Sequence, residues 1–199
     1  MSKTVLPLLL LALICGCAPP GVTMSVAADP KPQRTIAILD FDWTAPKPPP
    51  KESSVWLVSA EDAGQAVADQ VAALIVGVPG YSVLERTALR KILAEHDLSA
   101  AGIVQSGDYK RVGRLVNADS LVVGQVTTYS VGGWGPFAAA TAAFGARMVD
   151  AESGVTLWVI NGTRERGGLQ PGMCVAEMVT EIRPHFHKLL KRNRSAAGP

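Results

Sequence analysis

The sequence has few cysteines, few aromatic residues and little net charge. Only three of its 199 residues are cysteine, and two of them lie at the N-terminus, so a disulfide framework is not expected. Aromatic residues make up 6% of the chain and charged residues 18%. The formal net charge is only +2. No overall electrostatic field therefore argues for a nucleic-acid partner.

The one strongly apolar run has about ten residues and lies in the opening MSKTVLPLLLLALICGCAPP. It is too short to span a bilayer stably as a helix, and its order of lysine, apolar run and small residues is typical of a secretory signal. The segment Ile14-Cys15-Gly16-Cys17 resembles a bacterial lipobox. By that resemblance residues 1–16 are a lipoprotein signal peptide and Cys17 is the acylated first mature residue. The alternative is an ordinary signal peptide with an incidental cysteine.

Residues 17–34, which include APPGVTMSVAADPKPQR, are rich in proline, alanine and small polar residues. This composition predicts a flexible tether, which at roughly 3.5 Å per residue reaches about 55 Å. A lipid anchor on Cys17 thus keeps the domain near its membrane. Ala18, in place of aspartate, favours an outer-membrane lipoprotein facing the periplasm under the enterobacterial sorting rule. With Cys17 blocked, Cys174 has no internal disulfide partner and is expected to be a small buried hydrophobe.

Residues 35–193 are predicted to form one α/β domain, followed by a disordered tail at 194–199. The segment 35–43 is almost wholly apolar, as expected of a buried strand. Helical spacing of apolar residues starts at Ser59 and ends at Pro79-Gly80. A short strand (YSVLER) and two helices (RTALRKILAEHDL and SGDYKRVGRLVNA) follow.

Three further strands are predicted in SLVVGQVTTYSV, ATAAFGARMVDA and VTLWVINGTRE. The intervening turns GGWGP and ESG predict an antiparallel meander. A last helix begins at Pro171 and is expected to be kinked or broken at Pro184. The predicted fold is therefore a mixed five-stranded sheet with helices packed on it.

Two segments, GYSVLERTALRKILAEHDLSAAG and VGRLVNADSLVVGQVT, resemble the CsgG family. This family includes the curli secretion channel and LpoB-like activators of penicillin-binding proteins. The resemblance extends upstream to the first strand and downstream to RMVDAESGVTLW. The matching residues are Glu85, Arg86, Leu89, Ile92, Leu93, Glu95, Leu98, Gly102, Gly113, Ala118, Asp119, Val122, Val123 and Gly124. The resemblance implies a CsgG-like domain with interaction surfaces, and none of these residues forms a catalytic constellation.

The chain departs from the curli channel in its connections. That channel inserts two hairpins per subunit into the membrane, and each crossing strand needs about 9 to 11 alternating residues. The connection YSVGGWGPFAA is too short for this, and NGTRERGGLQPG carries three charges. We therefore do not expect secretion through membrane-inserted hairpins.

Asp40 and Asp42, at the end of TIAILDFDWT, allow a different hypothesis. A run of apolar residues followed by Asp-x-Asp resembles the nucleophile motif of Mg²⁺-dependent phosphatases of the haloacid-dehalogenase type. Such an enzyme also needs a late acidic pair at a strand end to hold the metal, and the sequence lacks one. The preferred interpretation is that the two aspartates mark the exit of a strand. His185 and His187 lie on different helix faces and do not predict a metal site.

Trp134 and Phe137 lie on the glycine-rich loop SVGGWGPF. Large apolar groups on such a loop suggest a contact with a partner protein or with the membrane interface, and packing back onto the domain is the alternative. Our hypothesis is that this loop contacts the partner.

The sequence as a whole predicts a non-enzymatic envelope lipoprotein, without a cofactor or metal, that acts as a scaffold or accessory factor in envelope assembly or export. Its expected contacts are the membrane, through Cys17, and an envelope protein. A homo-oligomer is possible on this interpretation. The alternatives are an oligomeric, curli-type transport component of the outer membrane and a phosphatase using Asp40 and Asp42.

Overall fold

The computed structural model describes residues 21–27, 31, 33–44, 60–133 and 135–196. Seven strands and six helices follow one another along these residues. The first part of the domain comprises β1 (Val22–Val26), β2 (Arg34–Ile38), β3 (Asp42–Trp43), α1 (Ala60–Ile75), β4 (Tyr81–Val83), α2 (Arg86–Glu95), α3 (Ala100–Ser106) and α4 (Tyr109–Val116). The second part comprises β5 (Ser120–Gly132), the short 3-10 helix η1 (Gly135–Phe137), β6 (Ala139–Asp150), β7 (Thr156–Gly167) and α5 (Pro171–Ala196).

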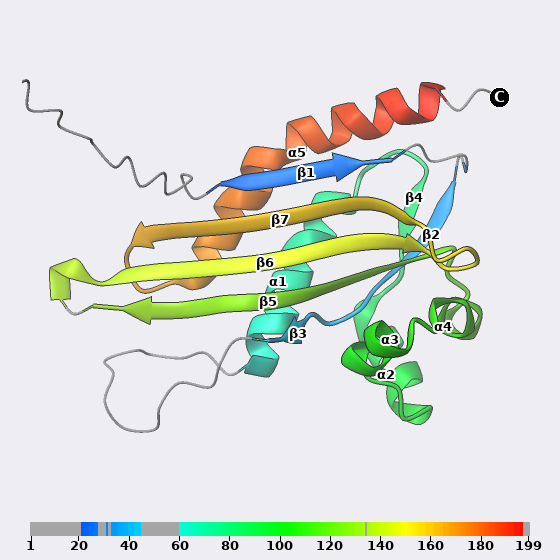
Figure 1. Ribbon diagram of the computed structural model, residues 1–199, viewed down its shortest axis with the longest axis horizontal. Helices are drawn as coiled ribbons and strands as arrows, with labels where there is room; N and C mark the ends of the chain where they lie inside the picture. Colours follow the sequence, from blue (N-terminus) through cyan, green and yellow to red (C-terminus); the bar gives the residue numbers. More distant parts are fainter. Residues whose placement is uncertain (1–20, 28–30, 32, 45–59, 134, 197–199) are drawn as a thin grey trace, which may run out of the picture.

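All seven strands belong to one mixed sheet, whose order is β1-β7-β6-β5-β2-β4 with β3 paired to β5 (Figure 1). Strands β5, β6 and β7 form the predicted antiparallel meander. Strands β2, β3 and β4 are parallel to their neighbours, because helices connect them. The sheet is thus parallel on one side and antiparallel on the other.

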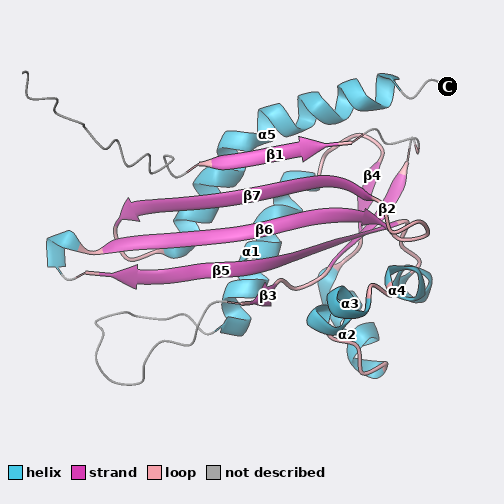
Figure 2. Cartoon of the chain, in the orientation of Figure 1, coloured by secondary structure: helices cyan, strands magenta, loops and turns pink. Residues whose placement is uncertain are grey.

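Helices cover different parts of the two faces of this sheet (Figure 2). Helices α1 and α5 pack together on one face, over a core that includes Val126, Phe144, Trp158 and Phe186. Helices α2, α3 and α4 lie on the other face, over a smaller core around Leu121 and the ends of β2 and β5. These three helices cover only the part of their face near the β6–β7 turn, and they leave the rest of it open.

The class of fold is as predicted, but the sheet has seven strands among the described residues and not five. One added strand, β1, lies inside the segment 17–34 that we predicted to be a tether. Its residues alternate between half-buried and exposed, and it pairs in antiparallel register with β7, from Val22 opposite Gly162 to Val26 opposite Trp158. The other added strand, β3, consists of two residues beyond β2. The tether prediction is therefore wrong for residues 22–26.

Two further differences concern helices. The sequence patterns predict no element around Ala100, yet this segment forms α3, whose cap Ser99 accepts a hydrogen bond from the Gly102 amide at 3.0 Å. Helix α5 runs through Pro184 without interruption and continues to Ala196, into the predicted tail, so the break expected at Pro184 does not occur. Within the described residues, no helix has the length and apolar character needed to cross a membrane.

Candidate interaction surfaces

The open face is the part of the sheet that α2, α3 and α4 leave uncovered. It is formed by outward-facing residues of β1, β5, β6 and β7, among them Thr23, Gln125, Thr127, Thr141, Gly145, Asn161, Thr163 and Glu165. Alternation along each strand places these residues opposite the α1–α5 core. Seven of these eight are uncharged, and their polar groups are mainly hydroxyls and amides.

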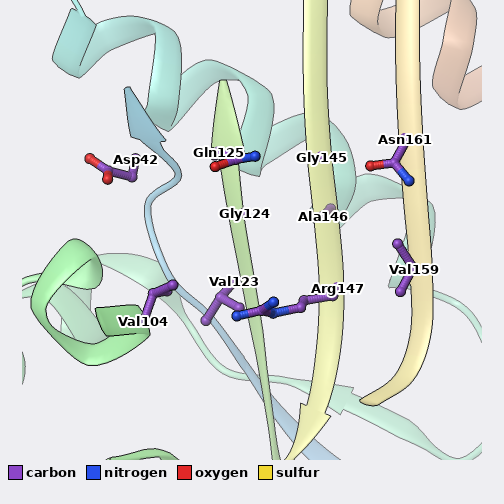
Figure 3. A pocket seen from close by; sticks show the side chains of 10 residues that line it. All are labelled: Asp42, Val104, Val123, Gly124, Gln125, Gly145, Ala146, Arg147, Val159 and Asn161. Atoms are coloured by element: carbon purple, nitrogen blue, oxygen red, sulfur yellow. The ribbon is translucent and has the colours of Figure 1, made fainter. Parts of the chain in front are cut away.

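Two hollows lie on this face. The larger has a volume of about 700 Å³ and extends across β5, β6, β7 and β1. The smaller has a volume of about 210 Å³ and lies where the open face meets α3 (Figure 3). Gln125, Gly145 and Asn161 line both hollows. The centre of the face is low because its residues are small: a β-carbon added to Gly145 would lie only 3.1 Å from the amide oxygen of Asn161, so a larger side chain would crowd that group.

Charged groups border the smaller hollow. Asp42 enters from β3 and Arg147 from β6; in Figure 3, Asp42 lies to the left of Gln125, and Arg147 extends below it, beside Val123. Arg147 donates a hydrogen bond to the Tyr109 hydroxyl on α4 at 3.0 Å, and an Asp42 oxygen accepts one from the Trp43 amide at 3.0 Å. The hollow thus has one acidic and one basic border. It contains no pair of a nucleophile and a base within hydrogen-bond distance among the interactions of the described residues.

Asp40, the other aspartate of the sequence hypothesis, lies in an ion cluster away from these hollows. Its Oδ2 accepts a hydrogen bond from Arg90 Nε at 2.9 Å, and its Oδ1 accepts from both Arg86 and Arg90. The hydrogen bond to Asp40 raises the pKa of Arg90. Arg86 also pairs with Asp69 of α1, so the cluster joins α1, α2 and the end of β2. Both oxygens of Asp40 are engaged by arginines, which is not the arrangement of a carboxylate nucleophile facing a metal-bound phosphate.

The residues of the sequence motif are structural in this fold. Glu85 caps α2 by accepting hydrogen bonds from the Thr87 and Ala88 amides, and these bonds lower its pKa. Asp119 accepts a hydrogen bond from the Thr35 amide at 2.9 Å. Gly124 gives room to the Phe41 ring, which lies 2.5 Å from where a β-carbon would be. These three residues of the motif therefore specify how helices and strands join.

The remaining candidate residues from the sequence are Cys17, Trp134, Phe137 and Cys174. Cys17 and Trp134 lie outside the described residues. Phe137 is 76% exposed at the end of η1. Cys174 is fully buried, as predicted, and its thiol lies 3.4 Å from the Ala140 carbonyl. Within the described residues there is no cluster of three or more histidine, cysteine, aspartate or glutamate side chains that could hold a metal ion.

Sequence reasoning did not find the open face. The individual residues were placed on strands, but the sequence does not show which strand face lacks a helical cover. The nearest available signal was the row of threonine and asparagine at alternate positions of the strands, as in Asn161 and Thr163, since fully buried faces carry few such residues.

The fold occurs in a solved structure of another protein, and further solved structures are similar at lower TM-scores. The lipoprotein GNA1162 from Neisseria meningitidis superposes with a TM-score of 0.58 at 15% sequence identity, covering 77% of this chain and 98% of that one. The PelC dodecamer from Paraburkholderia phytofirmans gives 0.48 at 15% identity, covering 81% and 96%. The LpoB C-terminal domain from Salmonella enterica gives 0.39 at 11% identity, covering 72% and 87%. No curated protein sequence matches the chain.

The sequence itself matches a family model over most of the domain. The model describes the curli production assembly/transport component CsgG, and the match covers residues 22–164. It begins at the first residue of β1 and ends within β7. It therefore includes the whole sheet except the end of its last strand, and this chain belongs to the CsgG family.

Proposed function

We propose that this chain is an outer-membrane lipoprotein, acylated at Cys17, that acts as a periplasm-facing scaffold or accessory factor by binding an envelope protein. The open face carries this proposal, because it is the one large part of the sheet that no helix of the described chain covers. Its hydroxyl and amide groups suit a partner that makes many hydrogen bonds and brings few charges. Catalysis has no support from the charged clusters, in which arginines engage both oxygens of Asp40.

The lipobox and the family membership support the envelope location. The lipobox was identified from residues 14–17, outside the matched range 22–164, so the two observations are independent. GNA1162, whose structure is similar to this one, is named a lipoprotein. Acylation is tested directly by the mass of the N-terminal peptide from the purified protein.

Site-specific photocross-linking in cells tests the open face. A photoreactive amino acid at Asn161 is expected to give a discrete adduct, whereas one at Glu95, on the exposed side of α2, gives none. Thr163→Arg, which places a charge beside the probe, is expected to remove the adduct, and Glu95→Arg is the matched control that leaves it. Equal adducts from both probe positions would show that the open face is not the binding surface.

An oligomeric transport component is the second candidate, favoured by the description of the family model. The mass of the acylated protein in detergent, measured by light scattering after size exclusion with negative-stain images of the same peak, separates the two. A closed ring supports the second candidate. A monomer supports the first candidate. An Asn161 adduct whose mass differs from that of a dimer of this chain then indicates that the partner is a different protein.

A further inference from the structure

Three of the five large apolar side chains that are exposed in the described residues lie at one end of the sheet. Phe137 is 76% exposed, Leu169 is 66% exposed and Met173 is 46% exposed. Phe137 lies in the connection between β5 and β6, residues 133–138, and Leu169 in the connection between β7 and α5, residues 168–170. Met173 lies in the first turn of α5. The Gly168 amide donates a hydrogen bond to the Ala138 carbonyl at 2.9 Å, which holds the two connections together. We call this end, defined by Phe137, Leu169 and Met173, the tip.

The tip is uncharged. Neither connection contains an acidic or basic residue. The nearest charged side chains along β7 are Arg164, Glu165 and Arg166, and the two arginines pair with α5, Arg166 with Glu177 at 2.7 Å and Arg164 with Glu181. The molecule thus ends in an apolar cap with a belt of charged residues behind it. An apolar cap followed by a belt of charged residues is typical of a protein surface that enters the interfacial region of a membrane.

The register of β1 places the lipid anchor on the side of the tip. Val22 lies opposite Gly162, and the Thr163 amide donates to the Gly21 carbonyl at 3.1 Å. Because β1 and β7 are antiparallel, the N-terminal end of β1 points in the direction in which β7 runs, toward Gly167 and the tip (Figure 1).

The length of chain before Gly21 then limits the distance to the membrane. Cys17 is four residues before Gly21, and four residues span at most about 14 Å. From Thr163 to Gly167, β7 advances about 13 Å toward the tip, at roughly 3.3 Å per residue. The anchor and the end of β7 are therefore at nearly the same level when this short segment is fully extended. Any less extended conformation brings the tip deeper into the leaflet.

We infer that the tip inserts into the headgroup region of the same phospholipid leaflet that holds the acyl chains of Cys17. The inference rests on the acylation proposed above. The anchor alone would leave the domain free to rotate about a short segment, whereas anchor and tip together make two attachments. These hold the strands steeply to the membrane and direct the β6–β7 turn and α4 into the periplasm, with the open face accessible from the side.

Depth-dependent fluorescence quenching tests this orientation. The full-length acylated protein carries a single nitrobenzoxadiazole label at Leu169→Cys and is reconstituted into vesicles of phosphatidylethanolamine and phosphatidylglycerol that contain spin-labelled lipid. Cys17 is blocked by its lipid, and burial both shields Cys174 and raises the pKa of its thiol, so neither competes for the label. The matched control is Val155→Cys, which replaces a residue 56% exposed in the β6–β7 turn, at the other end of β6.

The expected result is loss of most of the emission at position 169 and none at position 155. Adding Phe137→Ser to the Leu169→Cys protein is expected to reduce the quenching, because one of the inserted side chains is removed. Equal quenching at both positions, or none at position 169 in a protein whose N-terminal peptide carries the acyl mass, overturns the insertion of the tip and leaves the anchor intact. A peptide without the acyl mass overturns the anchor and this inference together.

A protein partner at the tip gives a separable result. In that case the label at position 169 is unquenched in the lipid vesicles but is shielded from iodide in native envelope membranes, and the leaflet is then not its occupant.

Discussion

The two ends of the β5–β6–β7 meander differ in almost every physical property. At the β6–β7 turn, Arg34 is 2% exposed and donates hydrogen bonds to Asp150 Oδ2 at 2.8 Å and to the Ser120 hydroxyl at 2.9 Å. Lys31 lies 3.4 Å from the same carboxylate. At the tip there is no charged residue, and Phe137 and Leu169 are exposed to solvent. One end holds buried charges and exposes one large apolar side chain, Val155, whereas the tip exposes three.

The charged end stabilises the fold, whereas the tip is suited to a contact outside the domain. Burial by itself raises the pKa of Asp150, but the hydrogen bond from Arg34, those from Ser153 and the charge of Lys31 outweigh it, so the pKa is held well below its ordinary value. The folded state therefore depends on the charged end. Phe137 and Leu169 bury little of their surface within the domain, so the burial of these two side chains contributes little to folding.

Removing the buried arginine should have the largest effect on stability. Arg34→Ala leaves the Asp150 carboxylate buried without its main partner, so we expect the free energy of unfolding to fall by about 3 to 5 kcal/mol. Urea denaturation monitored by circular dichroism measures it. The control is the double variant Arg34→Met with Asp150→Leu, which removes both charges and should recover most of the loss. A double variant no more stable than Arg34→Ala would show that the contribution of Arg34 to stability does not come from its ion pair with Asp150.

The backbone at the two ends can be compared at two glycines that have positive φ. Gly133 at the tip has φ +81° and a β-carbon there would lie 2.3 Å from the Phe137 carbonyl oxygen, whereas Gly154 in the β6–β7 turn has φ +73° and open space. Alanine at Gly154 should cost about 1 to 2 kcal/mol for the left-handed backbone alone. Alanine at Gly133 adds a clash and should cost about 2 to 4 kcal/mol. Equal losses in the free energy of unfolding would contradict the tight folding of the tip loop.

The pH dependence of stability should be traceable to Asp150. Because its pKa is lower in the folded state than the ordinary 3.8, its contribution is fully present above that value and is lost as the pH falls below it. Asp150→Asn is therefore expected to reduce the free energy of unfolding by about 2 kcal/mol at pH 7, for the loss of charge-assisted hydrogen bonds. The difference between the two proteins should begin to shrink near about pH 4 and continue to shrink below it, because the folded protein keeps the Asp150 charge to a lower pH than the unfolded protein does. A difference independent of pH would mean that the Asp150 charge does not act in the folded state.

Much of the architecture could be predicted from local patterns. The apolar spacing in Leu89 and Leu93 indicated α2, and the turn at Gly154 indicated the hairpin between β6 and β7, because each signal lies within a few residues of the element that it specifies. Strand β1 was missed although Val22, Met24 and Val26 alternate with Thr23 and Ser25. The surrounding prolines and alanines concealed this pattern, and its partner β7 is more than 130 residues away in the chain.

The candidate surfaces were less predictable than the fold. The exposure of Phe137 was suggested by the glycines around it, which is a local signal. Leu169 was not singled out, because its proximity to Phe137 depends on the hydrogen bond between Gly168 and Ala138, which joins segments 30 residues apart. The engagement of Asp40 by Arg86 and Arg90 is likewise a contact between a strand and a distant helix. Properties that depend on such pairings require the structure.

The smallest effect on stability should come from the tip itself. Leu169 is 66% exposed, so Leu169→Ser removes little buried surface, and we expect the free energy of unfolding to stay within about 0.5 kcal/mol of the original protein. Val155→Ser, at the opposite end and 56% exposed, is the matched control and should behave in the same way in solution. The two variants should differ only when the acylated protein is in vesicles, where Leu169→Ser alone increases the accessibility of a label at the tip to iodide. A large loss of stability in Leu169→Ser would place this side chain in the core, and the contrast between a stabilising end and a contacting end would then fail.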